Sequence, residues 1–291
     1  MVTGVNGFIG TALVRKLLAN QCQVVGVDIQ SETWVQDRNF IYLNQDLSKE
    51  DFNFDKFEIT KVVHCAAQTS VQQSIEYPVN DLTQNAIVSI RLFEACLNSG
   101  VENVVYLNSG GAMYGELKDA PFKESDAVNP VSPYAISKYS AEMYGRVLFG
   151  DSKVHFTSLA LGNVYGNISD NPKGIFYEIF KAFQSSRKFS LYGPDSLRDY
   201  VHVEDVVKAI LLATKTTGIE RFNISSGVGT KNSLVIEMFR EIIDSSLDID
   251  MFEIRRGDLR ASTLDVSKAE KLLGWKPEIS LRDSFNSIFE F

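Results

Sequence analysis

Short runs of β-branched and other apolar residues alternate with longer amphipathic runs along the first half of the chain, a pattern typical of an α/β protein with a parallel sheet. The first unit joins an apolar entry at Val2, an amphipathic run over residues 12–18 and a second apolar run over residues 22–28. Only two residues precede Thr3, so we expect the first strand to be very short. Later apolar runs predict strands at residues 40–44, 61–67, 103–108 and 154–161.

Two long helices are expected between these strands. Residues Asn80–Leu97 carry apolar side chains at helical spacing, and Asn98-Ser99-Gly100 provides a stop signal. Pro133 opens the second helix. The stripe of the first helix that we expect to face the core consists of Leu82, Ala86, Ile90, Phe93 and Leu97.

The regular alternation ends near Gly162, where irregular segments follow, among them a loop over Asn167–Lys173 and a helix around Ile175–Phe183. We therefore predict a Rossmann-type doubly wound parallel sheet with a smaller C-terminal α/β substrate-binding lobe. The predicted domains are residues 1–162 and 163–291, interleaved with each other.

Composition and charge narrow the class of protein without identifying a function. A formal net charge of -8, with both signs scattered over 291 residues, argues against nucleic-acid binding. We find no leader pattern and no apolar run of about 20 residues, so we expect no signal peptide, no membrane span and a cytoplasmic location. The three cysteines are Cys22, Cys65 and Cys96. They lack metal-ligand spacing, so we interpret them as packing residues and predict no metal site.

Three glycines at three-residue spacing, Gly4, Gly7 and Gly10, stand between the first strand and the first helix. Glycine suits a tight turn whose backbone must approach a pyrophosphate, and the helix N-terminus beyond it offers free N–H groups. Asp28, at the end of the second strand, is placed to accept hydrogen bonds from a ribose diol, which favours NAD over NADP. The plain alternative is a turn of the same shape that binds nothing.

Polar or small residues follow several predicted strands, at the edge where a doubly wound sheet binds its ligand. For Asp46, a cofactor contact and an ordinary loop aspartate are both open, and for Ser109 a ligand-facing hydroxyl and a turn cap are both open. His64 is interpreted as a packed, hydrogen-bonded residue. Ala66 and Ala67 leave room for a cofactor.

Tyr134 and Lys138 stand one helical turn apart in the helix opened by Pro133, so they share a face. An ammonium group and a positively charged nicotinamide beside the phenol favour its ionised form, so Tyr134 is a candidate base near neutral pH. The spacing itself is common by chance and gains weight from the glycine motif and the Ser109 strand end.

Taken together, these residues resemble the extended short-chain dehydrogenase/reductase family, and within it the UDP-hexose 4-epimerases. The resemblance covers essentially the whole chain. Its matching elements are Thr3-Gly4-x-x-Gly7-Phe8-Ile9-Gly10, Asp28, Asp46-Leu47, His64-x-Ala66-Ala67, Asn85, residues 109–115, Tyr134-x-x-x-Lys138, Asn163-Val164-Tyr165-Gly166, Arg198-Asp199-Tyr200, Arg255-x-Gly257-Asp258 and Leu273-Gly274-Trp275-x-Pro277.

The resemblance implies a fold, a reaction and a set of site residues. In such enzymes a tightly held NAD takes a hydride from C4 of the sugar and returns it to the other face, with Tyr134 as the base, Lys138 on the nicotinamide ribose and Ser109 as the hydroxyl helper. The implied cofactor-binding residues are Gly4, Gly7, Phe8, Ile9, Gly10, Asp28, Asp46, Leu47, Ala66, Ala67, Asn85, Tyr134 and Lys138. The implied substrate-binding residues are Ser109, Tyr134, Asn163, Arg198, Tyr200, Arg255, Asp258 and Ser262.

Five positions depart from or refine the family pattern. Gly110 stands where the catalytic serine or threonine is usual, so the helper role passes to Ser109, and Ala160 stands where many relatives have arginine. Gly111 and Ala112 replace the Asp-Glu pair of sugar-nucleotide dehydratases, which argues against dehydration. Ser262 matches a position where a small residue tolerates a 2-N-acetyl group, so UDP-N-acetylglucosamine is an expected further substrate.

Two alternatives remain at this point. One is a nucleotide-sugar reductase of the same fold, and the other is a non-catalytic dinucleotide-binding protein, which Gly110 and Ala160 would favour. Taken singly, Arg198 and Arg255 also read well as solvated surface charges. A homodimer is implied by the resemblance, with the stripe from Leu82 to Leu97 as a compatible surface.

Overall fold

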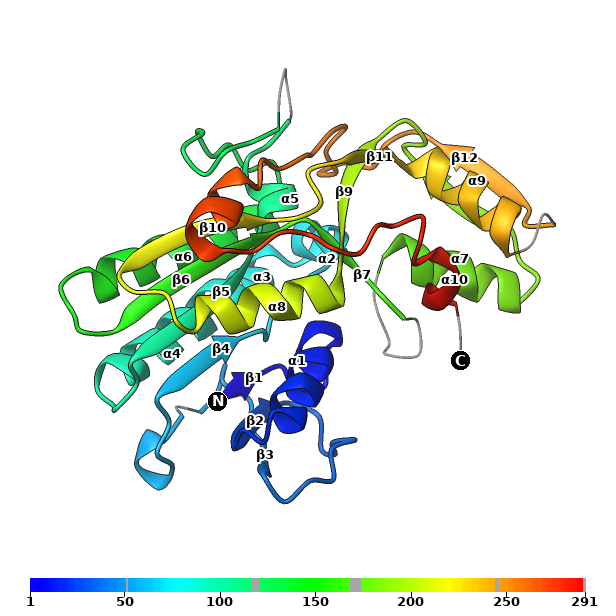
Figure 1. Ribbon diagram of the computed structural model, residues 1–291. Coiled ribbons are helices and arrows are strands. Elements are labelled where there is room, and N and C mark those ends of the chain that lie inside the picture. The colour runs from blue at the N-terminus through cyan, green and yellow to red at the C-terminus, as the bar shows by residue number, and fades with distance from the viewer. Residues whose placement is uncertain (51, 117–120, 168–173, 244–245, 290–291) are drawn as a thin grey trace.

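The computed structural model describes residues 1–50, 52–116, 121–167, 174–243 and 246–289, and a seven-stranded sheet organises them (Figure 1). Its strands pair in parallel in the order β10-β6-β5-β4-β1-β2-β3. The predicted doubly wound sheet is therefore confirmed, including the two-residue first strand, which lies between β4 and β2. The strands are β1 (Val2–Thr3), β2 (Val24–Asp28), β3 (Phe40–Asn44), β4 (Lys61–His64), β5 (Asn103–Ser109), β6 (His155–Leu161) and β10 (Ile219–Ile224).

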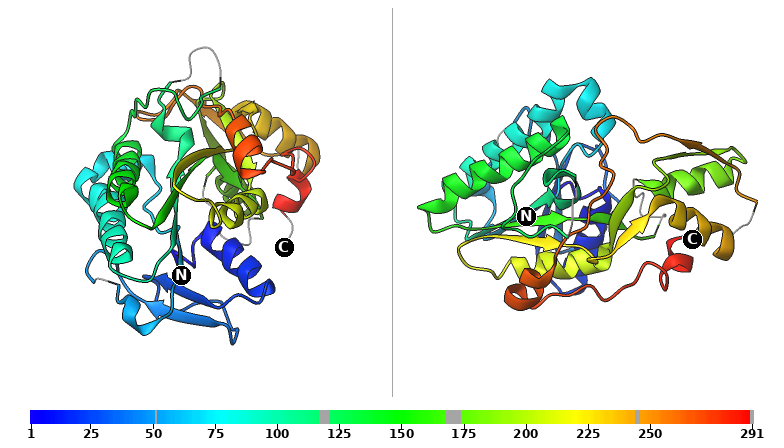
Figure 2. Two further views of the ribbon diagram at one scale, coloured as in Figure 1. Left: turned by 60° about the vertical axis from the view of Figure 1, so that its left-hand side comes forward. Right: turned by 90° about the horizontal axis from the view of Figure 1, so that it is seen from above.

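The strand order reverses between β1 and β4, and this reversal creates the ligand crevice of a doubly wound sheet. Helix α1 (Phe8–Ala19) packs with α8 (Val203–Ala213) on one face. The other face is covered by a second group of helices (Figure 2). This group consists of α2 (Val71–Glu76), α3 (Pro78–Leu82), α4 (Val88–Leu97) and α6 (Pro133–Gly150).

The helix expected at residues 80–97 forms, but with a π-helical turn, η2 (Thr83–Ile87), between α3 and α4. Ala86 and Phe93 of the predicted stripe are buried, whereas Leu82 is 44% exposed. The π turn adds a residue to the helical repeat, so positions before it rotate away from the face that the positions after it share. The assignment of Leu82 to the core was therefore wrong.

The second region builds two small sheets and three helices around its own core (Figure 1, right). Helix α8 and strand β10 follow Gly162 in the sequence, and β10 pairs with β6 in the central sheet. The division at Gly162 stays a prediction, and the loop predicted at 167–173 lies outside the described residues from 168 onward. The elements are β7 (Asn163–Tyr165), β8 (Phe189–Tyr192), β9 (Leu197–His202), β11 (Gly229–Lys231), β12 (Ile249–Phe252), α7 (Ile175–Gln184), α9 (Asn232–Ile242) and α10 (Phe285–Ile288).

The remaining short elements connect these layers. They are η1 (Phe54–Lys56), α5 (Gly110–Met113) and the π-helical turn η4 (Ala269–Leu273). None of the helices in the described ranges combines the length and the apolar character needed to cross a bilayer.

Candidate functional site

The glycine turn between β1 and α1 lies directly against the end of β4. Gly4 has a φ of +68°, and a Cβ added there would lie 2.7 Å from the Ala66 backbone nitrogen. A Cβ on Gly10 would lie 2.1 Å from the Gly4 carbonyl oxygen. Helix α1 begins at Phe8 with no side-chain cap on its first N–H groups. The turn thus combines close-packed backbone with unsatisfied donors, as a pyrophosphate requires.

Asp28 ends β2 beside this turn with its carboxylate held by backbone donors. Its Oδ2 accepts from the Asn6 N–H at 3.0 Å and its Oδ1 from the Gln30 N–H at 3.2 Å. Each oxygen keeps a further lone pair, so the carboxylate is oriented and still able to accept bonds from a ribose diol.

The other predicted cofactor residues fall into two groups. Ala66 and Ala67 are half-buried beside Gly4, whereas the Leu47 side chain packs into the core, which leaves its backbone for any cofactor contact. Asp46 bonds within its own turn, accepting from Ser48 N at 3.0 Å and Ser48 Oγ at 2.6 Å. These bonds, with Lys49, lower the pKa of Asp46 to about 2, and they favour the loop-aspartate interpretation.

Asn85 is almost fully buried in the π turn and bonds to protein through both ends of its amide. Its Oδ1 accepts from the Gln68 N–H at 2.9 Å, and its Nδ2 donates to Asp81 Oδ1 at 3.0 Å and Ser137 Oγ at 3.3 Å. Asn85 therefore holds the segment after β4 against α6, and a direct cofactor contact stays a prediction.

Tyr134 and Lys138 both lie in the N-terminal half of α6, as their spacing predicts. Lys138 is 3% exposed, and its Nζ lies 4.4 Å from the centre of the Tyr106 ring. Burial lowers the pKa of Lys138 to about 7. Within the described residues, the Lys138 ammonium donates no hydrogen bond to protein. Its three N–H groups are therefore available to a ligand. A ribose diol at this point would satisfy them, and the residues present therefore fit a dinucleotide.

The pKa of Tyr134 differs from the expectation. Burial raises it, the Asp81 charge raises it further, and only the interaction with the Ser109 hydroxyl acts to lower it. A bound nicotinamide would bring a positive charge to the phenol and favour the phenolate.

Ser109 ends β5 and lies near enough to Tyr134 to influence its phenol. The adjacent Gly110 has no space for a side chain, because a Cβ there would lie 2.7 Å from Leu264 Cδ1 and 2.8 Å from the Ala160 carbonyl oxygen. The absence of a hydroxyl at residue 110 thus has a steric reason, and Ser109 supplies the hydroxyl at this strand end. Ala160, the other departure, is fully buried beside Met113 and Leu264.

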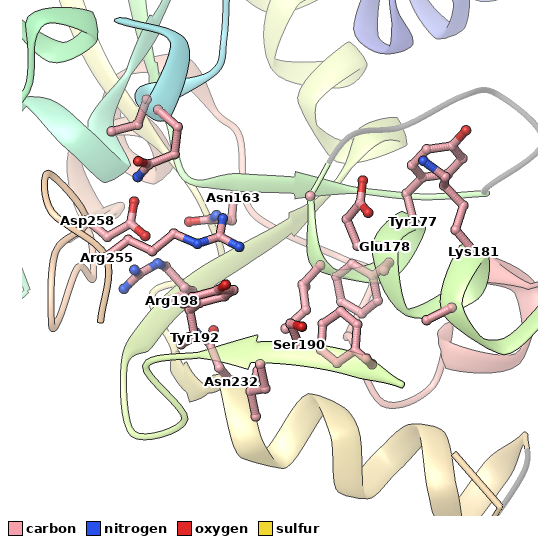
Figure 3. Close-up of a pocket in the computed structure, with 18 of the residues that line it drawn as sticks. Asn163, Tyr177, Glu178, Lys181, Ser190, Tyr192, Arg198, Asn232, Arg255 and Asp258 are labelled. Atoms are coloured by element: carbon pink, nitrogen blue, oxygen red, sulfur yellow. The ribbon is translucent and has the colours of Figure 1, made fainter. Parts of the chain in front are cut away.

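A cavity of about 970 Å³ lies between residues 69–72 and the second region. Figure 3 shows Arg198, Arg255 and Asp258 side by side at one end of it, with Asn163 next to them. The Arg255 guanidinium lies 3.6 Å from the centre of the Tyr192 ring. Two guanidinium groups facing one cavity favour a diphosphate over the solvated-surface interpretation. The predicted residues that line it are Asn163, Arg198, Tyr200, Arg255 and Asp258.

Ser262 does not line this cavity but lies next to the turn that follows Ser109. It is 2% exposed, and its Oγ lies 3.9 Å from the point where a Cβ on Gly111 would be. Asn163 Oδ1 lies 3.5 Å from the same point. Ser262, Asn163 and Gly111 therefore converge, at the junction between the Ser109 turn and the cavity.

Sequence reasoning missed several residues of this cavity. Tyr192 stacks under Arg255, and Asn232 accepts a bond of 3.4 Å from the buried Tyr200 hydroxyl and donates to the Gly193 carbonyl at 3.1 Å. Tyr192 directly precedes Gly193-Pro194, a turn signal that is the one clue the sequence offers. Gln72 and Ser190 carry no motif, since only the tertiary fold brings them to the cavity.

His64 and the cysteines are packing residues. The His64 ring bonds to Thr3 Oγ1 at 2.7 Å and Ser89 Oγ at 3.0 Å, and burial lowers its pKa to about 3, which confirms the packed interpretation. Cys96 is buried and Cys22 and Cys65 are half-buried, all as free thiols. Within the described ranges, no group of three or more metal-ligating side chains gathers.

Comparison with known proteins agrees with this geometry. The chain is 33% identical to UDP-glucose 4-epimerase of Mycolicibacterium smegmatis, over 100% of this chain and 97% of that protein. It superposes on the UDP-glucose 4-epimerase of Thermotoga maritima, solved with UDP-glucose, with a TM-score of 0.91, 34% identity and coverage of 99% and 96% of the two chains. The UDP-glucose 4-epimerase of Thermus thermophilus, solved with NAD, gives a TM-score of 0.90, 29% identity and coverage of 99% and 96%.

The match to a family model covers the whole central sheet. Residues 1–225 fit the model described as NAD dependent epimerase/dehydratase family, a span that includes β1, the Tyr134–Lys138 pair and β10. The predicted resemblance and fold class are confirmed by these matches together. With its glycine turn, its Tyr134–Lys138 pair and its seven-stranded sheet in the positions described, the chain belongs to the NAD dependent epimerase/dehydratase family.

Proposed function

We propose that the protein is a UDP-hexose 4-epimerase that inverts C4 of UDP-glucose and UDP-galactose with bound NAD. The observation that carries this proposal is the arrangement of the two halves of the site. Lys138 is buried one helical turn from Tyr134. The arginine-lined cavity reaches the turn after Ser109 at Asn163, whose Oδ1 lies 3.5 Å from the Cβ position of Gly111. The relatives described above bear the same activity in their names.

Tyr134 acts as the base and then as the acid. It takes the proton of the sugar 4-hydroxyl as C4 is oxidised to a ketone, and gives a proton back to that oxygen when C4 is reduced on its other face. Bound NAD would supply the hydride acceptor and donor for C4 within one turnover. Lys138 holds the nicotinamide ribose through its unpaired ammonium hydrogens, and Ser109 bonds to the reacting oxygen. No external reductant is needed, because oxidation and reduction balance.

Arg198 and Arg255 hold the diphosphate while the sugar turns over. The 4-keto sugar must present both faces to the same hydride donor, so it must rotate about its link to a fixed anchor. Two guanidinium groups and the buried Asn232–Tyr200 pair give the nucleotide such an anchor. Asp258 lies beside both arginines and keeps them in place through its charge.

The small Ser262 side chain supports a second substrate pair, UDP-N-acetylglucosamine and its galacto epimer. Because Ser262 converges with Asn163 and Gly111 beside the catalytic turn, a large side chain at residue 262 would fill the space that a 2-N-acetyl group needs. Ser262→Tyr should abolish the acetylated activity and spare UDP-glucose. Equal loss of both activities would reject this gate.

A homodimer fits the surface of α3, η2 and α6, which pack against each other. Apolar side chains stay exposed there, including Val79 at 78% and Val147 at 74%. Exposed apolar area of this extent on neighbouring helices favours a symmetric helix–helix interface. The cytoplasmic location remains a prediction of the sequence.

The proposal is tested by incubating purified protein with UDP-glucose and, separately, UDP-N-acetylglucosamine without reductant, and following the sugar H4 and anomeric signals by NMR. Appearance of the galacto epimer without net NAD reduction supports the epimerase. A folded, NAD-bound sample that inverts neither sugar would instead favour the reductase or the non-catalytic alternative.

A further inference from the structure

Glu142 is a charged residue in the interior of the protein that none of the roles above uses. It lies four residues after Lys138 and eight after Tyr134 in α6, and its side chain is 0% exposed. Arg221, on β10, supplies the counter-charge, with both Nε and one terminal guanidinium nitrogen at 2.6 Å from Glu142 Oε1. A buried ion pair costs desolvation that its attraction rarely exceeds, so its presence is weak evidence for stability alone.

The second carboxylate oxygen of Glu142 points to the strand end that carries Ser109. Glu142 Oε2 accepts from Asn108 Nδ2 at 2.7 Å and from Ser158 Oγ at 2.8 Å. Asn108 Oδ1 in turn accepts from the backbone N–H of Ser109 at 2.7 Å. An unbroken path of short bonds therefore runs from Arg221 through Glu142 and Asn108 to the Ser109 backbone.

The Asn108 amide has no freedom to turn within this path. Its second N–H faces Met113 Sδ at 3.5 Å, so both hydrogens and the carbonyl oxygen have protein partners. Asn108 is 3% exposed, which keeps water from replacing any of these bonds. The orientation of the amide thus fixes where the peptide before Ser109 lies, and with it the Cβ and hydroxyl of Ser109.

Gly110, the residue after Ser109, makes the position of the Ser109 hydroxyl important. Gly110 is pressed against Leu264 and the Ala160 carbonyl, so this turn offers no second side chain next to Ser109 that could take over its hydroxyl. Among the described residues, the Ser109 hydroxyl is the group that lowers the pKa of the Tyr134 phenol. A shift of the Ser109 backbone by a fraction of an ångström would therefore be felt at the reacting groups.

We propose that Glu142, anchored by Arg221, is a positioning residue that acts through Asn108 to set the Ser109 hydroxyl against Tyr134. The same carboxylate joins α6, which carries the base, to β5, which carries the helper hydroxyl, so the two reacting side chains are held in one frame. The proposal rests on the proposed epimerase function for its kinetic test, but its geometric content is independent of the substrate.

The test compares Asn108→Ala with Ser158→Ala. Both variants remove one bond of nearly equal length to the same oxygen of Glu142, and only Asn108 continues to Ser109. We expect Asn108→Ala to lower kcat about 10- to 100-fold with KM for UDP-glucose within about 2-fold, and to move the acidic limb of the kcat–pH profile to higher pH. Ser158→Ala should leave kcat and the acidic limb of the kcat–pH profile unchanged, even if it lowers the Tm as much as Asn108→Ala does.

A second variant and a second measurement keep the test independent of folding and of the substrate. Arg221→Lys preserves the charge while removing the forked contact, and should give a smaller loss of kcat with the same upward shift of the limb. The pKa of Tyr134, read by NMR of ¹³C-labelled tyrosine and assigned with Tyr134→Phe, should rise in Asn108→Ala and stay in Ser158→Ala.

Each result decides between alternatives. If wild-type protein is inactive, the proposed function fails, while a raised Tyr134 pKa in Asn108→Ala still supports the positioning role. If Asn108→Ala and Arg221→Lys leave both the Tyr134 pKa and the pH limb of an active enzyme unchanged, or if Ser158→Ala changes them equally, the positioning role is overturned.

Discussion

Lys138 is a residue whose buried charge destabilises the cofactor-free protein. An ammonium group that is 3% exposed and without a hydrogen-bonded anion costs stability, and burial lowers its pKa from 10.5 to about 7. Above pH 7 the folded protein loses this proton while the unfolded chain keeps it until about pH 10.5. The free energy of unfolding therefore rises with pH across this window because of Lys138.

Replacing Lys138 by an apolar residue of similar length should consequently stabilise the cofactor-free protein. We expect Lys138→Met to have a Tm several degrees above wild type at pH 6.5, and this advantage should shrink as the pH is raised to 9.5, while epimerase activity is lost at every pH. Differential scanning calorimetry at three pH values measures it. A Tm gap that is negative, or constant with pH, would show that the Lys138 charge is not buried at a cost.

Gly110 gives a second prediction at the scale of a single residue. Gly110→Ala adds a Cβ 2.7 Å from Leu264 Cδ1 and 2.8 Å from the Ala160 carbonyl, so the Ser109 turn must move. We expect a loss in kcat of about 10-fold or more. Gly100→Ala is the matched control, since its Cβ would meet nothing within 4 Å. Wild-type kcat in a folded Gly110→Ala enzyme would contradict the tight packing of this turn.

At the scale of elements, the site depends on a contact between α2 and the loop that carries Arg255 and Asp258. Gln72 Nε2 donates to the Arg256 carbonyl oxygen at 3.2 Å, and the Cβ position of Gly257 lies 2.7 Å from Ile75 Cδ1. The helix after β4 therefore sets the position of a loop nearly two hundred residues later in the chain. Sequence spacing contains no trace of such a contact, although the loop itself was identified from its motif.

Gly257→Ala should therefore raise KM for UDP-glucose more than it lowers kcat, because the displaced loop weakens the hold on the diphosphate. Gly218→Ala is a matched control, with a similar positive φ of +80° against +84° but no atom within 4 Å of its Cβ. Steady-state kinetics of the two variants measures the split. Equal KM values in both would mean that strain at a positive φ, rather than the contact with α2, governs this loop.

The whole molecule was largely predictable where local pattern and tertiary structure agree. The apolar runs at 103–108 and 154–161 became strands β5 and β6 of a parallel sheet, because buried parallel strands are continuous apolar segments. The run at 40–44 became the half-exposed edge strand β3. Leu82 was assigned wrongly because a π turn cannot be read from helical spacing. Glu142 and Tyr192 were missed because a charge inside a helix, or a tyrosine in a turn, gains its meaning only from distant partners.

At the scale of the whole molecule, we predict that two copies of the chain form a dimer through α3, η2 and α6. Val147, 74% exposed on α6, should lie in the proposed dimer interface, so Val147→Asp should convert the dimer to a monomer in light scattering with little change in the Tm of the single chain. Lys215→Asp places the same charge at an exposed position just after α8, on the opposite face of the sheet, and should leave the dimer intact. A wild-type monomer, or a Val147→Asp dimer, would exclude this surface as the interface.

The central claim, that the hydride leaves C4 and returns to C4 of the same sugar, is tested most directly with UDP-glucose carrying deuterium at C4. We predict UDP-galactose with the deuterium retained at C4 and no incorporation from solvent, in protein supplied with neither reductant nor free NAD. Loss of the label to water, or a product that appears only when a reductant is added, would contradict it.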